Sequence, residues 1–494
     1  MKSYLIKRFF RSLVSLTIVM SLVFSLIYTA IPKDRVFYTD TNVEKLQKHP
    51  DDLLNYKHLQ WARLGFTEYR TLAEFCREEK APDLEVCNEP DSSQARRFDM
   101  YYRGLGWNVE AFPESGRLFA YRDISNAQRI FNFWSRLVQI DHPWRQGSKS
   151  RVFVGRDFND APTLMCLGCN HKYLLYFNSQ FPFIHQNLIR FSLGISYPTY
   201  SGQEIVDVLT NSQGRKVVQT RRLDSGTTVE TALDLHSCRY HPTATAQQLE
   251  MFPDGFAYCR SVREGPSMMM ISFILGMGSL LLSYGIGLPL GLWMARYQGK
   301  AFDKFGQFYI IVMMSMPSLA YVILVRYLGG RYGGLPTMFA LYGSRNFRSF
   351  VLPILSLAIG SIAGRMMWMR RYMVDQASQD YVRFARSKGL SEGQIFSRHI
   401  FRNAIGPIAH GLPAAVIFTL SGALITESVY GIPGMGKLLP DSIAVYNNSM
   451  VVGITFLFTM LSIMSTLLGD LLLTALDPRI SLYAEKTPKR RKRP

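Results

Sequence analysis

Cysteine is absent from the chain after Cys259, although the sequence runs to 494 residues. All six cysteines lie in one mixed, polar segment, at positions Cys76, Cys87, Cys166, Cys169, Cys238 and Cys259. An even number of cysteines confined to one segment indicates disulfides in an oxidising, extracytoplasmic compartment. Pairing between sequence neighbours, 76 with 87, 166 with 169 and 238 with 259, is the simplest arrangement, but sequence alone does not determine connectivity.

A metal site is the alternative for Cys166 and Cys169, which are two residues apart and are followed by His171. A structural zinc site needs four ligands, usually supplied as two such pairs. No second Cys/His pair at zinc-finger spacing occurs in the sequence. We therefore expect disulfides and no metal.

Common catalytic motifs are also lacking. There is no H-E-x-x-H sequence, and Gly194–Pro198 lacks the final glycine of G-x-S-x-G. The segment Gly431–Leu438 resembles the phosphate-binding loop G-x4-G-K-[ST], but Leu438 has no hydroxyl for Mg²⁺ and no strand precedes it. We expect a chain that is not an enzyme and binds no cofactor itself.

Acidic residues are scarce outside residues 33–266. That segment holds 29 Lys and Arg and 28 Asp and Glu, and the remainder holds 27 basic and 9 acidic residues. The basic excess lies beside long apolar runs, where Lys and Arg mark the cytoplasmic side of a membrane. The net charge of +19 therefore indicates membrane topology, and we expect no nucleic-acid partner.

Six apolar runs, each long enough to cross a bilayer, lie outside that segment. They cover about 9–31, 268–295, 305–325, 350–369, 405–426 and 450–475. The first follows Lys2, Lys7 and Arg8, as in a signal peptide. Its apolar part is longer than a signal peptide needs and no small-x-small cleavage site is evident, so we expect an uncleaved span.

Charge asymmetry orients the six expected spans. Basic residues gather in the second-to-third connection, around the fourth-to-fifth connection, and at 489–493 in the tail. Both termini are therefore expected in the cytoplasm and residues 33–266 outside. Arg331, Arg345 and Arg348 depart from the rule, because their connection must lie outside.

The segment 33–266 is expected to form an α+β extracytoplasmic domain between the first two spans. It contains four of the six tryptophans, and residues 215–235 alternate in a strand-like way. The predicted organisation is a membrane helix at 1–32, the inserted domain at 33–266, a five-helix membrane domain at 267–480 and a basic cytoplasmic tail at 481–494. For the tail, attraction to anionic lipid is a minor alternative to a topology signal.

A charged loop follows the fourth run, and its sequence from Asp380 to Leu390 is D-Y-V-R-F-A-R-S-K-G-L. Residues 381–387 can form a short helix that Gly389 ends, and Ser391 can cap a second helix from about 392 to 404. Tyr381, Phe384 and Leu390 would then stand among Arg and Lys side chains. This combination suits a groove on a partner protein.

The loop resembles the cytoplasmic loop of oligopeptide and dipeptide permeases of ABC transporters. Other pieces of the chain match in order: L-P-L-G at 288–291, L-P at 352–353, E-S-V-Y-G-I-P-G-M-G-K at 427–437, and G-D-L at 469–471 followed by L-D-P-R-I at 476–480. S-L-G-I-S at 192–196 resembles the motif between the family's first two spans. The long insert resembles that of the Gram-positive oligopeptide permeases.

The resemblance implies the type I ABC importer permease fold, with six transmembrane helices, in the plasma membrane. It implies the first of two homologous permease subunits, two cytoplasmic ATPases that hold ATP and Mg²⁺, and an extracellular or lipid-anchored peptide-binding protein. The ATPase-coupling loop at 372–404 would act through Tyr381, Arg383, Phe384, Ala385, Arg386, Lys388, Gly389 and Leu390. Importers in general have Glu-Ala-Ala at 383–385, so Arg383 replaces the glutamate here.

The resemblance also marks two further sets of residues. The outer-segment motif supplies Glu427, Pro433, Gly434 and Gly436, and the closing signature supplies Asp470, Asp477, Pro478 and Arg479. Glu427 and Asp470 lie near span ends, so they either face headgroups or water or act in transport. Dipeptides, nickel or another small solute are alternative cargoes, and a membrane-anchored extracellular enzyme or sensor is an alternative function.

Overall fold

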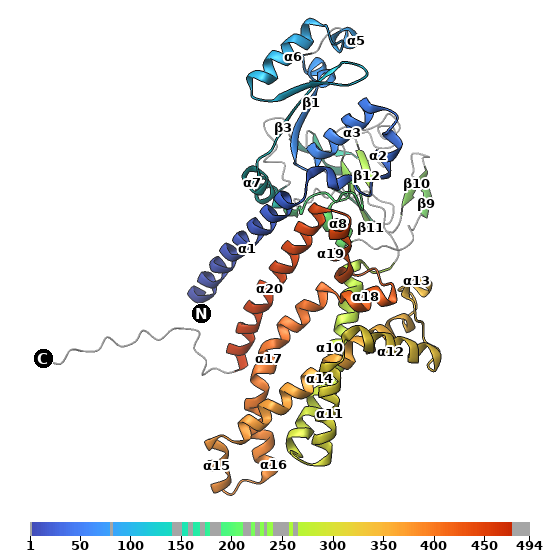
Figure 1. Cartoon of the computed structure of the whole chain (residues 1–494). Helices are drawn as coiled ribbons and strands as arrows, with labels where there is room; N and C mark the ends of the chain where they lie inside the picture. The colour runs from blue at the N-terminus through green and yellow to red at the C-terminus, as the bar shows by residue number, and fades with distance from the viewer. Residues whose placement is uncertain are drawn as a thin grey trace, which may run out of the picture.

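The computed structural model describes residues 2–79, 83–140, 151–156, 162–167, 173–177, 189–210, 219–222, 228–231, 235–240, 256–259 and 265–476. The molecule is elongated (Figure 1). The region between the first and second long helices, residues 33–266, is called the insert and lies at one end. The helices α15 (Asp380–Ser387) and α16 (Glu392–Gln394) lie at the other end.

Within the described ranges, five helical segments are long and apolar enough to cross a membrane. They are α1 (Lys2–Ala30), α10 (Met268–Arg296), α14 (Arg348–Ala377), the stretch Glu392–Tyr430 and α20 (Asn448–Leu476). The stretch Glu392–Tyr430 comprises α16, a π-helical turn at Ile395–Ile400, α17 (Phe401–Phe418), a 3-10 turn at Thr419–Ser421 and α18 (Leu424–Tyr430). These segments agree with the expected first, second, fourth, fifth and sixth runs.

The expected third span is not one straight helix. The chain forms α11 (Ala301–Ser315) and α12 (Ser318–Arg331), and their axes differ in direction by 107°. Pro317 stands between them as the N-cap of α12, and proline cannot donate the amide hydrogen bond that would continue α11. The described chain therefore has five spans, or six if this bent pair counts as one.

Glycines allow α10 and α14 to pack closely. A Cβ atom at Gly287 would lie 2.8 Å from Cβ of Arg365, and one at Gly291 would lie 2.6 Å from the carbonyl oxygen of Met366. Small residues are what bring helix backbones together in a membrane. The pair forms the centre of the membrane helices, with α11 and α12 packed against α14 and with α17 packed between α14 and α20 (Figure 1).

The first half of the insert combines helices with an antiparallel sheet in the order β1-β3-β2. The strands are β1 (Thr67–Thr71), β2 (Asn108–Ala111) and β3 (Leu118–Asp123). The helices are a 3-10 turn at Lys33–Phe37, α2 (Thr41–Leu46), α3 (Pro50–Arg63), α4 (Leu72–Glu78), α5 (Leu84–Cys87), α6 (Ser93–Gly104) and α7 (Asn126–Leu137). Phe98 and Leu72 are completely buried at its far end.

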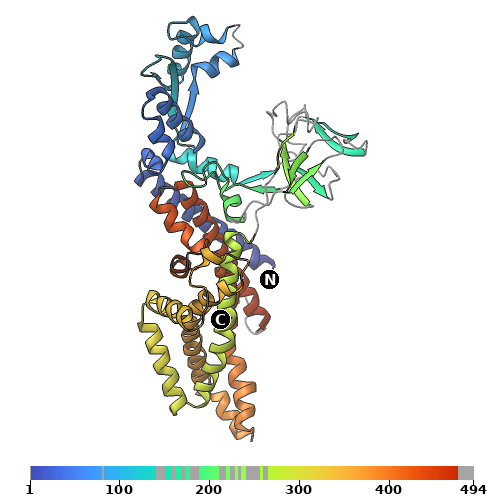
Figure 2. The same cartoon turned by 90° about the vertical axis from the view of Figure 1, so that its right-hand side faces the viewer.

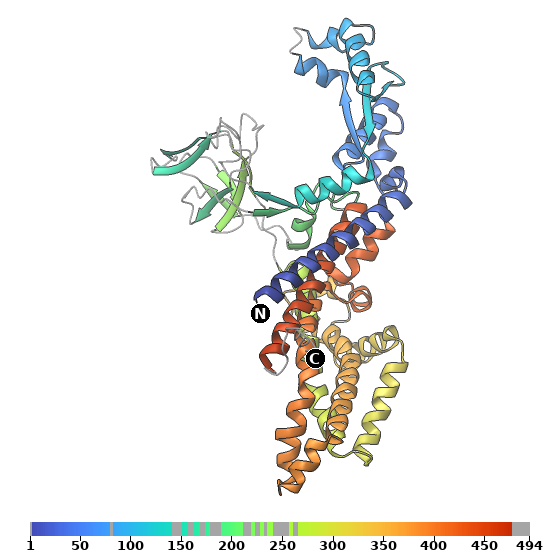
Figure 3. The ribbon, with the colours of Figure 1, turned by 90° about the vertical axis from the view of Figure 1, so that its left-hand side faces the viewer.

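The second half of the insert is built mainly of strands. They are β4 (Val138–Ile140), β5 (Arg151–Arg156), β6 (Pro162–Leu167), β7 (Tyr173–Phe177), β8 (Ile189–Phe191), β9 (Gln219–Arg222), β10 (Thr228–Thr231), β11 (Leu235–Tyr240) and β12 (Phe256–Cys259), with the helix α8 (Ile205–Thr210). Figures 2 and 3 show the teal and green strands standing to one side of the blue first half.

The remaining short helices α13 (Phe339–Tyr342) and α19 (Met435–Ala444) lie in the connections before α14 and before α20. In the core next to the insert, Ile205 of α8 packs with Met435 of α19, Ile454 of α20 and Met20 of α1. A Cβ atom at Gly453 would lie 3.0 Å from the side chain of Ile205. The insert is therefore seated directly on the ends of the membrane helices.

Candidate functional site

The helix α15 ends at Ser387, and Gly389 terminates it as the sequence predicts. The amide of Gly389 donates to the carbonyl of Arg386 at 2.9 Å, and the amide of Leu390 donates to the carbonyl of Ala385 at 3.4 Å. Gly389 has φ +78°, a left-handed conformation that glycine adopts without a Cβ clash. These two bonds form a Schellman motif, which ends the helix sharply.

The second helix starts at the predicted cap. The hydroxyl of Ser391 accepts from the amide of Gln394, and the side chain of Gln394 accepts from the amide of Ser391. This capping box satisfies two amides that a helix start leaves free. The second helix differs from the expectation only in its regularity, because the π-helical turn Ile395–Ile400 follows α16 before α17 begins. We call α15 and α16 together the α15–α16 hairpin.

Two apolar side chains fix α15 against the membrane helices. Val382 and Ala385 are buried in a cluster with Met369 and Met373 of α14. Ile395, Ile400 and Ala404, from the second arm of the hairpin and α17, complete the cluster. A displacement of α15 would therefore be transmitted directly to α14 and α17, since packed cores resist gradual deformation.

The opposite face of the hairpin is exposed, apolar and cationic. Phe384 is 61% exposed, and Nζ of Lys388 lies 4.5 Å from the centre of its ring. Leu390 is 36% exposed, and Arg383 is also exposed, with an ion pair to Asp380 at 3.5 Å. This surface presents a large aromatic ring with nearby basic groups, which are frequent anchors in protein interfaces.

Arg386 stiffens the turn between the two arms. Its Nε lies 2.8 Å from Oε1 of Glu392, and this carboxylate raises the pKa of the Arg386 guanidinium. Tyr381 is less available than the sequence suggests: it is half-buried, and its hydroxyl donates to Gln376 at 2.8 Å. Of the three side chains expected to contact a partner protein, Phe384 and Leu390 are exposed and Tyr381 is half-buried.

The outer-segment motif folds around the carboxylate of Glu427, which is completely buried. Its Oε1 accepts from the hydroxyl of Ser272 at 2.8 Å and from the amide of Ala423 at 3.0 Å, and Oε2 accepts from the amide of Lys437 at 3.0 Å. The carboxylate thus joins α10, α18 and α19. Because the amide of Lys437 donates to this carboxylate, it is not available to a phosphate group, as it would have to be in a phosphate-binding loop.

The glycines of this motif make room for that carboxylate. A Cβ atom at Gly434 would overlap the carboxyl group of Glu427, and one at Gly436 would lie 2.7 Å from the amide nitrogen of Ala423. Ile432, two residues after the end of α18, is buried beside Tyr430. Pro433 stands between these positions in the turn that leads to α19.

The closing signature is described only at its start. Asp470 of α20 forms an ion pair with Arg8 of α1, and its Oδ1 lies 3.4 Å from Nε2 of His410 on α17. Its role here is to join three helices. Asp477, Pro478 and Arg479 lie outside the described residues.

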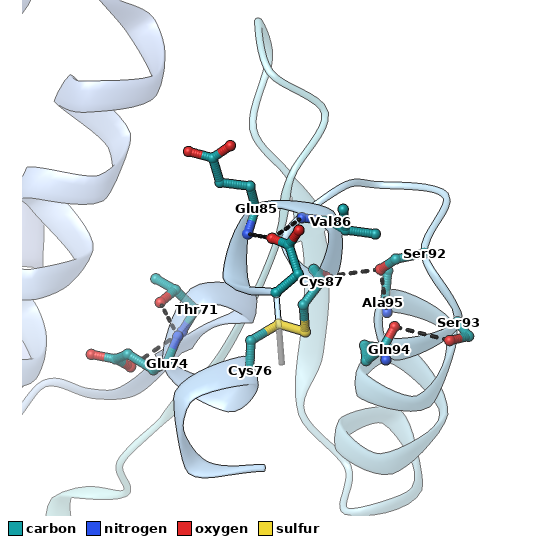
Figure 4. Close-up of a disulfide and its surroundings, with 11 residues drawn as sticks. Thr71, Glu74, Cys76, Glu85, Val86, Cys87, Ser92, Ser93, Gln94 and Ala95 are labelled. Atoms are coloured by element: carbon teal, nitrogen blue, oxygen red, sulfur yellow. Dashed lines mark hydrogen bonds between the residues drawn. A yellow bond between two sulfur atoms is a disulfide. The ribbon is translucent and has the colours of Figure 1, made fainter. Parts of the chain in front are cut away.

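One disulfide of the expected neighbour arrangement is present among the described residues. A disulfide joins Cys76 at the end of α4 to Cys87 of α5, as Figure 4 shows. Cys238 of β11 and Cys259 of β12 stand directly opposite each other in the antiparallel register. Cys166 lies on β6, and Cys169 and His171 lie outside the described residues. No cluster of three potential metal ligands occurs within the described ranges.

Two interactions in the structure were not foreseen. The carboxylate of Asp303 is completely buried and accepts from Nε and Nη2 of Arg370 at 2.6 and 2.8 Å, which joins α11 to α14. Asn447, also completely buried, joins the insert to the start of α20. Asp303 and Arg370 are 67 residues apart in the sequence, so no sequence pattern pairs them. The one signal was that charged residues are rare next to apolar segments and are often functional or paired there.

Comparison with known proteins finds a family match for most of the membrane helices and a full-length relative. The profile of the family "Binding-protein-dependent transport system inner membrane component" matches residues 287–482. The oligopeptide transport system permease protein AmiC of Streptococcus pneumoniae is 38% identical over 494 residues, covering 98% of this chain and 99% of that protein. This chain belongs to the oligopeptide and dipeptide permease family of ABC transporters. It is a helical membrane permease.

Two further permeases align with part of the chain. The inner membrane ABC transporter permease protein YejB of Escherichia coli O157:H7 is 32% identical over 42% of this chain and 62% of its own length. The dipeptide transport system permease protein DppB of Bacillus subtilis is 32% identical over 43% of this chain and 68% of its own length. A solved structure of the MetNI methionine ABC transporter aligns with 42% of the chain, at 13% identity and a TM-score of 0.34.

Proposed function

We propose that this permease carries oligopeptides across the plasma membrane and that separate ATPase subunits drive it through the α15–α16 hairpin. The observation that carries this proposal is the hairpin itself. One face is buried in the cluster with Met369 and Met373, and the other face exposes Phe384 and Leu390. A rigid element with one anchored face and one free apolar face suits the transmission of motion between subunits.

The proposed assembly contains this chain, a second homologous permease, two ATPases that bind ATP and Mg²⁺, and an extracellular or lipid-anchored peptide-binding protein. We propose the type I importer fold, in which the bent pair α11 and α12 counts as the third of six spans. The hairpin and both termini would face the cytoplasm and the insert would lie outside. The disulfide Cys76–Cys87 supports that orientation, because such bonds persist in oxidising compartments.

Full-length similarity favours oligopeptides over smaller cargo. The oligopeptide permease AmiC aligns through the insert as well as the membrane helices, whereas the dipeptide permease of Bacillus subtilis aligns with 43% of the chain. We propose that the insert serves as the docking platform of the peptide-binding protein. Met100 and Tyr101 on α6 are 68% and 57% exposed, so replacing both by Ser should leave the fold intact. Unchanged affinity of that variant for the binding protein would place the docking surface elsewhere.

Replacing Gly389 by Pro tests the coupling proposal. Proline fixes φ near −65° and so cannot adopt the φ of +78° seen at this position. We expect normal membrane insertion and the loss of ATP-dependent peptide uptake in reconstituted vesicles. Gly393→Ala is the matched control, because no atom lies within 4 Å of its added methyl group. Wild-type uptake by the Gly389→Pro variant would show that the hairpin does not couple ATP to transport.

A further inference from the structure

An arginine and a tyrosine meet inside the membrane helices, away from the hairpin. The guanidinium carbon of Arg365 on α14 lies 4.4 Å from the ring centre of Tyr284 on α10. Both residues lie within spans that are apolar enough to cross a membrane. Tyr284 is 12 residues from Arg296 at the end of α10, which corresponds to about 18 Å of helix. The pair therefore lies deep in the bilayer region.

Both side chains carry a buried donor without an acceptor. The Nε of Arg365 and the hydroxyl of Tyr284 are shielded from solvent and have no hydrogen-bond partner in the part of the chain that the structure describes. The neighbouring helices α10 and α17 contain no Asp or Glu, and the only one on α14 is Asp375, ten residues further along. The helix α11 also packs against α14 and carries Asp303, but Arg370 binds that carboxylate. Among the described residues, no carboxylate pairs with Arg365.

Arg370, on the same helix, has a structural role and provides a comparison for Arg365. Five residues after Arg365, it makes two short hydrogen bonds to the buried carboxylate of Asp303. A charged group in the bilayer is costly, and an unsatisfied buried donor adds a further penalty. Arg370 offsets this cost within the chain, whereas Nε of Arg365 has no acceptor among the described residues and its guanidinium makes a cation–π contact with Tyr284. An acceptor on a bound molecule would satisfy this donor.

The side of α14 that bears Arg365 continues into an open, polar and aromatic stripe. Positions 361, 365, 368 and 372 recur at helical spacing and share one face. Ser361 and Trp368 are exposed, and the ring of Trp368 stacks on Tyr372 at 5.5 Å. Arg365 therefore stands on the same helix face as exposed polar and aromatic side chains.

We propose that Arg365 and Tyr284 bind the C-terminal carboxylate of the peptide as it crosses the membrane. This rests on the proposed function, since it assigns a subsite for the cargo of that same permease. A guanidinium matches the two oxygens of a carboxylate, and the tyrosine hydroxyl supplies one further donor. Every linear peptide with a free end has this group, so the site recognises cargo without regard to sequence. One arginine holds it weakly enough for release.

Uptake of paired peptides tests the proposal. The complete transporter is reconstituted in vesicles and given one uncharged peptide sequence as the free acid or as the C-terminal amide. The measured quantity is the ratio of acid uptake to amide uptake. Any preference of the peptide-binding protein affects every permease variant equally, so changes in this ratio belong to the permease.

We expect Arg365→Gln to lower the acid-to-amide ratio about tenfold, as loss of a charge-assisted hydrogen bond commonly does. Tyr284→Phe should lower it less. Arg348→Gln is the control, because it removes an exposed charge from the start of the same helix, away from this stripe. An equal loss of both uptakes in Arg365→Gln would overturn the proposal in favour of an acidic partner on the second permease.

Two other outcomes are decisive. An unchanged ratio in Arg365→Gln overturns the proposal, while absence of peptide uptake by the wild type would instead refute the proposed function. If Arg365→Gln does not assemble, Arg365→Lys and Tyr284→Phe carry the test. Lysine keeps the charge and loses the two-pronged geometry, so a wild-type ratio in both of these variants overturns the proposal.

Discussion

The side-chain amide of Asn447 donates a 2.9 Å hydrogen bond to the hydroxyl of Ser196, although 251 residues separate them. The same amide donates to the hydroxyl of Thr199 at 2.8 Å. Its oxygen accepts from the amides of Tyr197 and Met450, at 3.4 and 3.1 Å. One buried side chain thereby connects the segment between β8 and α8 of the insert to the start of α20.

Replacing Asn447 by Ala should loosen the insert from the membrane helices. The substitution leaves several buried donors and acceptors without partners, which costs about 1–3 kcal/mol for each. We expect a lower midpoint of thermal unfolding in detergent. We also expect faster proteolysis of the insert. Asn403→Ala, at an exposed position of α17, serves as the control. Equal stability of the two variants would show that the Asn447 contacts do not hold the insert in place.

Replacing Glu427 by Gln distinguishes a structural carboxylate from one that acts in transport. The carboxylate accepts from three donors, and an amide group would direct its own NH₂ at some of them. We expect a less stable protein, by about 2–4 kcal/mol, with uptake lost in proportion to the folded fraction. Thermal unfolding and uptake are measured on the same preparation. A fully stable variant without uptake would instead assign Glu427 to transport.

His58 should make the stability of the insert depend on pH. It is buried among the rings of Trp61, Tyr69, Phe119 and Tyr121, whose centres lie 4.8–5.2 Å away. Burial, and then the charge of Lys33, lowers its pKa from 6.5 to about 4. The unfolded chain therefore takes up a proton more readily than the folded chain. The contribution of neutral His58 to the free energy of unfolding is therefore full above pH 6.5, and it declines as the pH falls from 6.5 towards 4.

The replacement His58→Phe should remove that dependence between pH 6.5 and 4. Phenylalanine fits an aromatic environment and has no proton to bind. We expect the wild type to lose unfolding temperature over this range more steeply than the variant, with thermal unfolding of the purified chain as the measurement. His49→Gln is the control, since His49 is exposed. Parallel pH profiles for wild type and His58→Phe would contradict this explanation.

The sequence determined the features that depend on neighbouring residues. Long apolar runs identified five membrane helices, because length and hydropathy decide whether a helix can cross a bilayer. Gly389 and Ser391 predicted the end of one helix and the start of the next, because backbone conformation and capping are local. The ordered motifs around Asp380–Leu390 and 427–437 identified the family for the same reason.

Only the tertiary structure decided which distant groups meet. The bond between Asn447 and Ser196 and the ion pair between Asp303 and Arg370 require contacts across many intervening residues, and pattern alone does not reveal them. The bend between α11 and α12 also escaped prediction, since Pro317 is compatible with either a kinked span or a broken one. The structure likewise separated two arginines of one helix: Arg370 pairs with the carboxylate of Asp303, and Arg365 has no carboxylate partner among the residues that the structure describes.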